Sequence, residues 1–188
     1  MAVRISAARR GARTSAWSRR ARTWTGVGVT ALLLIAVLAA DRWLIGPLAE
    51  ISGPAVVNDG DTLSIAGERF RLDGVDAPEQ EQSCTGKDGK AWACGREAAR
   101  RLRVLVAGRD VRCRARTTDR FGRGIAVCEL ADGQSLNGWL VRQGWAVATG
   151  YDGTYEDEQA DAKAAGRGIW AGSFEAPKAW RARHPRAD

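Results

Sequence analysis

The sequence predicts an α+β fold, mainly a small β-barrel accompanied by about three helices. Three features predict it: short runs that alternate polar and apolar residues, longer runs with one apolar helical face, and glycine-rich turns between them. Along the chain, three strands are followed by a helix, two strands and further helices. A five-stranded antiparallel barrel with a helix between its third and fourth strands is an OB-fold. We therefore expect an OB-fold domain over residues 54–172.

The second and third strands are expected at Thr62–Ile65 and Arg69–Val75, joined by a turn at Ala66-Gly67. The first of these runs is short and half apolar. The second alternates apolar and charged residues, which places its apolar side chains on one face. The two runs therefore predict a hairpin.

The remaining elements follow from the same periodicities. A helix is expected at Glu97–Ala107, where Gly108 ends an apolar stripe. Strands at Val111–Thr117 and Gly124–Leu130 flank a turn. Later in the chain we expect a helix to Gln143 capped by Ser135, a short strand at Trp145–Ala148, and a helix at Tyr155–Ala165 capped by Thr154.

The N-terminal region has the pattern of an export signal. Residues 1–23 are rich in arginine, and Thr25–Ala40 is uncharged. Trp24 and Trp43 flank this segment, about 28 Å apart along a helix, which is close to the thickness of a bilayer core. We expect a hydrophobic helix at residues 24–44 that anchors the chain in a membrane, with a cleaved signal peptide as the alternative. The basic residues before it predict export of the domain, with a linker at residues 45–53 and a polar tail at residues 173–188.

Charge and histidine content limit the chemistry of the domain. The net charge of the chain is +7, and the first 48 residues carry eight arginines and one acid. The domain itself is therefore neutral, and the basic pI is weak evidence for nucleic-acid binding. The single histidine, His184, lies in the tail. This argues against Ser-His-Asp catalysis and histidine-ligated zinc, so a general base must be a carboxylate, a lysine or a metal-bound water.

The four cysteines predict two disulfides, because the domain is expected to be exported. In the predicted hairpin, Cys113 lies opposite Cys128, and directly opposed residues can be bridged. Cys84 and Cys94 are then the remaining pair. The alternative, a Cys₄ zinc site, is disfavoured because no two cysteines have the short spacing typical of zinc ligands.

One stretch, residues 58–79, concentrates the groups that can carry chemistry. If the hairpin forms, Asp61 and Asp76 become neighbours, and two adjacent carboxylates repel unless a cation lies between them. Such oxygen ligands suit Ca²⁺ or Mg²⁺. Arg71 could hold an anion beside the metal, a combination that favours phosphoryl chemistry. The alternative interpretation is a solvated acidic turn.

Three motifs in this order resemble those of the thermonuclease (micrococcal-nuclease-like) family, and the resemblance covers residues 54–172. They are Asp59-Gly60-Asp61-Thr62, Arg71-Leu72-x-x-Val75-Asp76-x-Pro78-Glu79 and Asp119-Arg120-Phe121-Gly122-Arg123-Gly124.

The resemblance implies an OB-fold, one Ca²⁺, and hydrolysis of DNA and RNA that leaves 3′-phosphates. It implies that Asp61 and Asp76 ligate calcium together with the backbone carbonyl of Ala77. It also implies that Glu79 positions or deprotonates the attacking water. Arg71 and Arg123 match the two arginines on the reacting phosphate.

The sequence departs from the family pattern at a few positions. The family often has threonine where Ala77 stands and tyrosine where Phe121 stands. Phe121 and Tyr151 are candidate substrate contacts, and Asp59 is a candidate support for the metal ligands.

Two alternatives to an exported nuclease are a catalytically weak nucleic-acid-binding module tethered outside the cytoplasm and a membrane-anchored envelope-binding protein. The expected acids and arginines are all present, which favours the nuclease. We expect a monomer, and no protein partner is evident.

Overall fold

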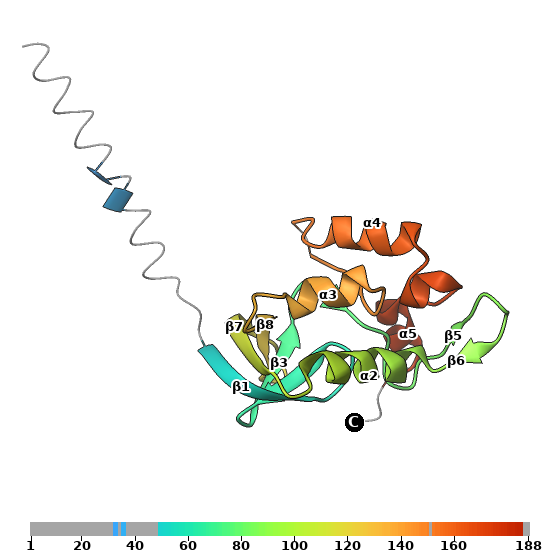
Figure 1. The fold of residues 1–188 in the computed structure, drawn as a ribbon, viewed down its shortest axis with the longest axis horizontal. Helices are drawn as coiled ribbons and strands as arrows, with labels where there is room; N and C mark the ends of the chain where they lie inside the picture. The colour runs from blue at the N-terminus through green and yellow to red at the C-terminus, as the bar shows by residue number, and fades with distance from the viewer. Residues whose placement is uncertain (1–31, 34, 37–48, 151, 186–188) are drawn as a thin grey trace, which may run out of the picture. The chain divides into compact units, whose positions relative to one another are not determined.

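The computed structural model describes residues 32–33, 35–36, 49–150 and 152–185 (Figure 1). The predicted hydrophobic helix at residues 24–44 lies outside the described residues, except for four positions that are helical and exposed. Within the described ranges, no helix is long and apolar enough to cross a bilayer.

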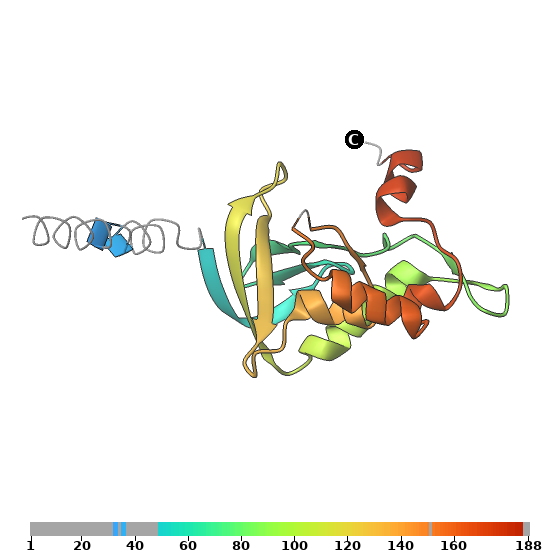
Figure 2. The same cartoon turned by 90° about the horizontal axis from the view of Figure 1, so that it is seen from above.

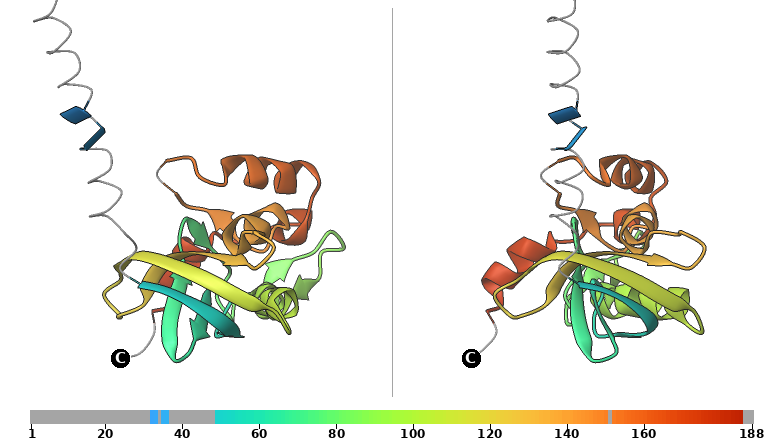
Figure 3. Two further views of the ribbon diagram at one scale, coloured as in Figure 1. Left: turned by 60° about the vertical axis from the view of Figure 1, so that its left-hand side comes forward. Right: turned by 90° about the vertical axis from the view of Figure 1, so that its left-hand side faces the viewer.

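Five strands close into a barrel in the order β1-β2-β3-β8-β7. Their bounds are β1 (Ala49–Val57), β2 (Thr62–Ile65), β3 (Glu68–Leu72), β7 (Asp110–Thr118) and β8 (Gly124–Leu130). Two further views show β7 between β1 and β8 (Figure 3), and the β7–β8 hairpin projects from the barrel (Figure 2). The five-stranded barrel is confirmed. It is mixed rather than wholly antiparallel, because β3 and β8 run parallel.

Strand β1 begins inside the segment expected to be a linker, residues 45–53. Its first six residues pair with β7, and its last three, Ala55–Val57, pair with β2. Strand β1 thus pairs with β7 along its first part and with β2 along its last part, which closes the barrel. Gly53 and Pro54 interrupt the alternating pattern in the middle of β1, so the period-2 signal did not reveal its full length.

The helices flank this barrel. Helix α2 lies between the third and fourth barrel strands in sequence, as predicted, and α3 packs against α4 and β8. The helical elements are α2 (Cys94–Val106), α3 (Leu136–Arg142), α4 (Glu156–Ala164), the 3₁₀ helix η1 (Gly168–Ala171) and α5 (Pro177–Arg183). Two small sheets pair β4 (Val75–Asp76) with β9 (Val147–Ala148), and β5 (Cys84–Thr85) with β6 (Ala91–Trp92).

The main core forms between the barrel and these helices. Its fully buried side chains include Leu63 and Leu72 from the β2–β3 hairpin, Leu102 from α2 and Leu140 from α3. Burial of such side chains is the main favourable term in folding. One face of the β2–β3 hairpin thus packs into the core, and the other face carries residues of the candidate site.

The helix caps agree with the sequence in one case and differ in another. Ser135 caps α3 by accepting a hydrogen bond from the Gly138 amide, as predicted. Thr154 does not cap α4. The N-cap is Tyr155, which has a left-handed backbone (φ 69°) and makes no side-chain cap bond, while the Thr154 side chain turns to Asp152.

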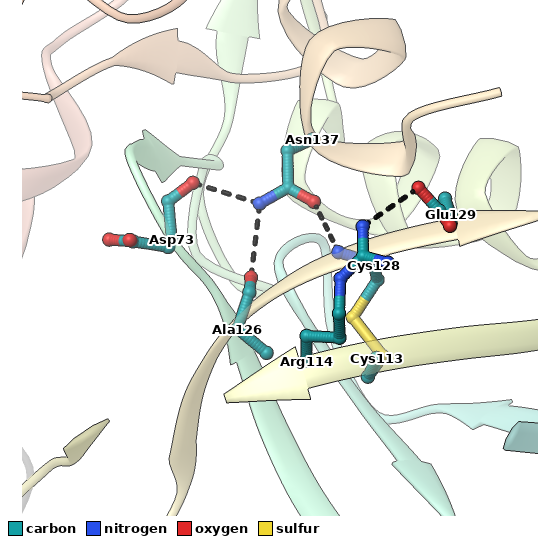
Figure 4. Close-up of a disulfide and its surroundings, with 7 residues drawn as sticks. All are labelled: Asp73, Cys113, Arg114, Ala126, Cys128, Glu129 and Asn137. Atoms are coloured by element: carbon teal, nitrogen blue, oxygen red, sulfur yellow. Dashed lines mark hydrogen bonds and ion pairs between the residues drawn. A yellow bond between two sulfur atoms is a disulfide. The ribbon is translucent and has the colours of Figure 1, made fainter. Parts of the chain in front are cut away.

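Both predicted disulfides are present. Cys113–Cys128 joins opposed residues of β7 and β8, with Cα atoms 4.1 Å apart, and Cys84–Cys94 joins β5 to α2. Beside the first disulfide, the buried Asn137 of α3 accepts from the Cys128 amide and donates to the carbonyls of Asp73 and Ala126 (Figure 4). Asn137 therefore fixes the turn that leads into β4.

The segment expected to be a polar tail contains helix α5. Pro177 occupies the first turn of this helix, where its fixed φ and missing N–H favour helix initiation. This helix was not predicted from the sequence, and α5 contributes a side chain to the site described below.

Candidate active site

Two buried aspartates, Asp61 and Asp76, form the centre of the site. Asp61 directly precedes β2, Asp76 ends β4, and each is 4% exposed. Arg71 of β3 binds both carboxylates, with Nη1 at 2.9 Å from Asp61 Oδ1 and Nη2 at 2.8 Å from Asp76 Oδ1. Because one guanidinium group reaches both, the two carboxylates are neighbours, as the hairpin predicted.

The strand register explains why these groups meet. Thr62 lies opposite Arg71 in the β2–β3 pair, so Arg71 lies beside the start of β2. The Leu72 amide donates to the backbone carbonyl of Asp61 at 2.9 Å, which fixes Asp61 against the end of β3. The site is therefore built on the barrel strands and positioned by the ladder itself.

The Asp61 carboxylate is held by its own network. It accepts hydrogen bonds from the Thr62 hydroxyl (3.1 Å) and the Ala77 amide (3.2 Å). Asp59 accepts from the Asp61 amide at 3.1 Å, so it supports the turn behind the carboxylate. At Gly60 a Cβ would lie 2.6 Å from the Ala77 Cβ, so this turn packs tightly against Ala77.

The electrostatics of this pocket favour a cation. Burial raises the pKa of Asp61 to about 7, the Arg71 guanidinium opposes this rise, and the nearby carboxylates of Asp59 and Asp76 add to it. Negative charge is therefore crowded into a poorly solvated space. A positive group between the carboxylates relieves both the repulsion and the loss of hydration.

Glu79 lies beside Asp76 and is 16% exposed at its side chain. Its amide donates to Oε1 of the fully buried Gln82 at 3.2 Å. A Cβ on Gly95, in the first turn of α2, would lie 1.7 Å from the Glu79 carbonyl oxygen. The backbone of Glu79 is thus fixed by Gln82 and by close packing against α2.

Arg123 connects to the same pocket through Thr62. Its guanidinium pairs with Asp119 at 2.7 Å, and its Nη1 lies 3.4 Å from the Thr62 hydroxyl, which itself donates to Asp61. Phe121 is 66% exposed beside Arg123, whose guanidinium carbon lies 5.4 Å from the ring centroid. Tyr151, the other candidate substrate contact, lies outside the described residues.

The structure adds an arginine that the sequence did not single out. Arg181 of α5 contacts both oxygens of Asp76, at 2.8 and 3.0 Å, and Oε1 of Glu79 at 2.9 Å. Gln82 was also missed, and Thr62 was named only as part of a motif, without a role. They are polar residues in ordinary sequence positions, and only their complete burial distinguishes them.

The donor set suits a hard cation. In the part of the chain that the structure describes, no three His, Cys, Asp or Glu side chains converge as a metal cluster. The candidate set is smaller: the carboxylates of Asp61 and Asp76 and the backbone carbonyl of Ala77. All three are oxygen donors, and calcium completes such a set with water or substrate oxygens. The burial and mutual proximity of the two carboxylates fit this ion.

The family model of staphylococcal nuclease homologues matches residues 69–172, more than half of the chain. The chain belongs to the staphylococcal nuclease family. The matched region contains Arg71, Asp76, Glu79 and Arg123, while Asp61 lies just before it.

Individual relatives carry two kinds of name. The succinoglycan biosynthesis protein ExoI of Rhizobium meliloti (strain 1021) is 44% identical over 66% of this chain and 67% of its own length. An uncharacterized endonuclease of Escherichia coli O157:H7 is 33% identical over 72% of this chain and 87% of its own length. A probable endonuclease, LCL3, of Schizophyllum commune is 30% identical over 62% of this chain and 46% of its own length.

Proposed function

We propose that this protein is a calcium-dependent nuclease that hydrolyses phosphodiester bonds of DNA or RNA and leaves 3′-phosphate ends. The observation that carries the proposal is the buried pair Asp61 and Asp76 bridged by Arg71. Family membership and relatives named as endonucleases support the same reaction class.

Asp61, Asp76 and the Ala77 carbonyl would hold the calcium ion. When bound, the ion supplies positive charge that offsets the charge gained by the phosphate in the transition state. Arg71 contacts one oxygen of each carboxylate, so its guanidinium lies beside the residues that would hold the ion and could donate to a phosphate bound there.

The other side chains supply proton transfer and a second guanidinium. Glu79 accepts the proton of the attacking water, so no histidine is needed. Arg123, connected to the pocket through Thr62, binds a further phosphate oxygen. Water adds to phosphorus and the bond to the 5′ oxygen breaks. The 5′ oxygen leaves as a hydroxyl group after taking a proton from solvent, and the phosphate stays on the 3′ oxygen.

We also propose that the domain acts outside the cytoplasm. Its four cysteines form two disulfides, which persist in oxidising compartments. The basic residues and the uncharged segment at the N-terminus support export, with the segment acting either as a membrane anchor or as a cleaved signal.

A second candidate is a nucleic-acid-binding module with weak catalysis. The exposed ring of Phe121, with Arg120 and Arg123 near its face, favours this function. Exposed aromatic rings beside basic side chains bind single-stranded nucleic acids by stacking.

A digestion assay distinguishes these functions. Purified full-length protein is incubated with DNA or RNA in calcium or in excess chelator, with Glu79→Gln as the catalytic variant. The nuclease predicts cleavage in calcium, little in chelator, and a large loss in the variant. Cleavage that persists in chelator rules out the metal mechanism, and binding without cleavage supports the second candidate.

A further inference from the structure

The C-terminal helix α5 places a positive charge on the residues that the proposed reaction needs. Arg181 donates from Nη1 and Nη2 to the two oxygens of Asp76, at 2.8 and 3.0 Å. Nη1 also lies 2.9 Å from Glu79 Oε1. Asp76 is the expected metal ligand and Glu79 the expected base, so one guanidinium group engages both.

A guanidinium fork and a metal ion use the same lone pairs of a carboxylate. Arg71 takes only one oxygen of Asp76, whereas Arg181 contacts both. A cation that binds Asp76 must therefore compete with Arg181. The same guanidinium group also contacts Oε1 of Glu79, so one movement of α5 would release both side chains from Arg181.

The helix that carries Arg181 buries little of its own surface. Of the seven residues of α5, all within the described part of the chain, Pro177 is the buried one. The preceding segment is attached to β5 by two backbone hydrogen bonds between Ser173 and Thr85, and to the Glu79 loop by Gln82 Nε2, which donates to the Glu175 carbonyl at 2.7 Å.

A helix this short is marginal by itself. The free energy of local opening is small for elements that bury little surface, and elements that move in function are of this kind. The attachment at Ser173 and Glu175 keeps Arg181 close to the site even when the helix undocks.

We propose that Arg181 is an internal competitor of calcium, and that α5 must release Asp76 before the ion binds. This inference rests on the proposed function. The apparent dissociation constant for calcium equals the intrinsic constant divided by the fraction of molecules in which α5 is undocked. If about a tenth of the molecules have α5 undocked, calcium binding is about tenfold weaker. By linkage, calcium in turn favours undocking of α5.

Calorimetric titration of calcium chloride into full-length protein tests this competition. Arg181→Gln is expected to bind calcium about tenfold more tightly than the wild type. The matched control is Arg183→Gln, on the same helix, whose partner is Glu175 rather than Asp76, and it should bind like the wild type. Equal or weaker binding by Arg181→Gln overturns the inference.

Hydrogen exchange gives a second readout that does not depend on activity. The amides of residues 178–183 in the wild type should exchange faster in saturating calcium than in chelator, and unchanged or slower exchange overturns the inference. If the wild type binds calcium and Arg181→Gln binds it with the same affinity, the proposed competition is wrong and the proposed function stands. If neither protein binds calcium, the metal mechanism of the proposed function fails as well.

Discussion

Replacing Arg71 with lysine tests whether the shape of the guanidinium group matters more than its charge. Arg71 makes one charge-assisted hydrogen bond to each of two carboxylates, at 2.9 and 2.8 Å. A lysine ammonium retains the charge, but it is a single point and cannot present two donors in a planar fork. Arg71→Lys therefore loses at least one directed contact to carboxylate or phosphate.

The expected size of this loss follows from that one contact. A hydrogen bond to a charged group contributes about 1.5–3 kcal/mol, which corresponds to a rate loss of roughly ten- to 200-fold. We expect this fall in the initial rate of DNA hydrolysis at saturating calcium, with only a small decrease in melting temperature measured by circular dichroism.

The matched control for this variant is Arg112→Lys. Arg112 also directs two guanidinium nitrogens at an acid, both to Oε1 of Glu129 across β7 and β8, and its side chain is 46% exposed. Because this pair lies outside the Asp61–Asp76 pocket, the control should keep its activity. An Arg71→Lys variant that folds normally and hydrolyses DNA at the wild-type rate would refute the reasoning.

Two further substitutions test the scaffold. Gly95→Ala places a Cβ 1.7 Å from the Glu79 carbonyl oxygen, so we expect a lower melting temperature and a loss of activity of about 100-fold. The control is Gly138→Ala in α3, whose Cβ would lie 3.4 Å from Tyr155 and should be tolerated. Equal melting temperatures and activities of the two variants would contradict this packing. The hydrogen bond from Arg100 lowers the pKa of Glu97 from 4.5 to about 2, so Glu97→Gln should lower stability at pH 7 by less than about 1 kcal/mol. This difference should shrink as the pH falls below 4.5 towards 2, and thermal unfolding that shows it growing in acid would exclude the ion pair as its source.

The barrel was predictable because its strands carry local signals. Strand β8 has the predicted bounds, Gly124–Leu130, and the alternation of β7 places Cys113 opposite Cys128. This register holds up to Ala115, where a bulge shifts the pairing by one residue. The start of α2 at Cys94 was missed because its N-cap, Ala93, has no capping side chain for the sequence to reveal.

The candidate site was partly predictable for a similar reason. Asp61, Arg71 and Asp76 lie close in sequence around one hairpin, so strand geometry alone brings them together. Arg181 meets Asp76 across 105 positions, and Gln82 meets the Glu175 carbonyl across 93. Such contacts depend on how α5 docks against the rest of the domain, and this docking cannot be predicted from residue type or from spacing in the sequence.

The central claim is that Asp61 and Asp76 share one hard cation. A crystal structure of the protein grown with calcium tests it most directly, through the anomalous scattering of the ion. We predict one ion within about 2.3–2.6 Å of both carboxylates and the Ala77 carbonyl, with Arg181 displaced from Asp76. An ion bound elsewhere, or aspartates that keep only their arginine partners at saturating calcium, would contradict the account.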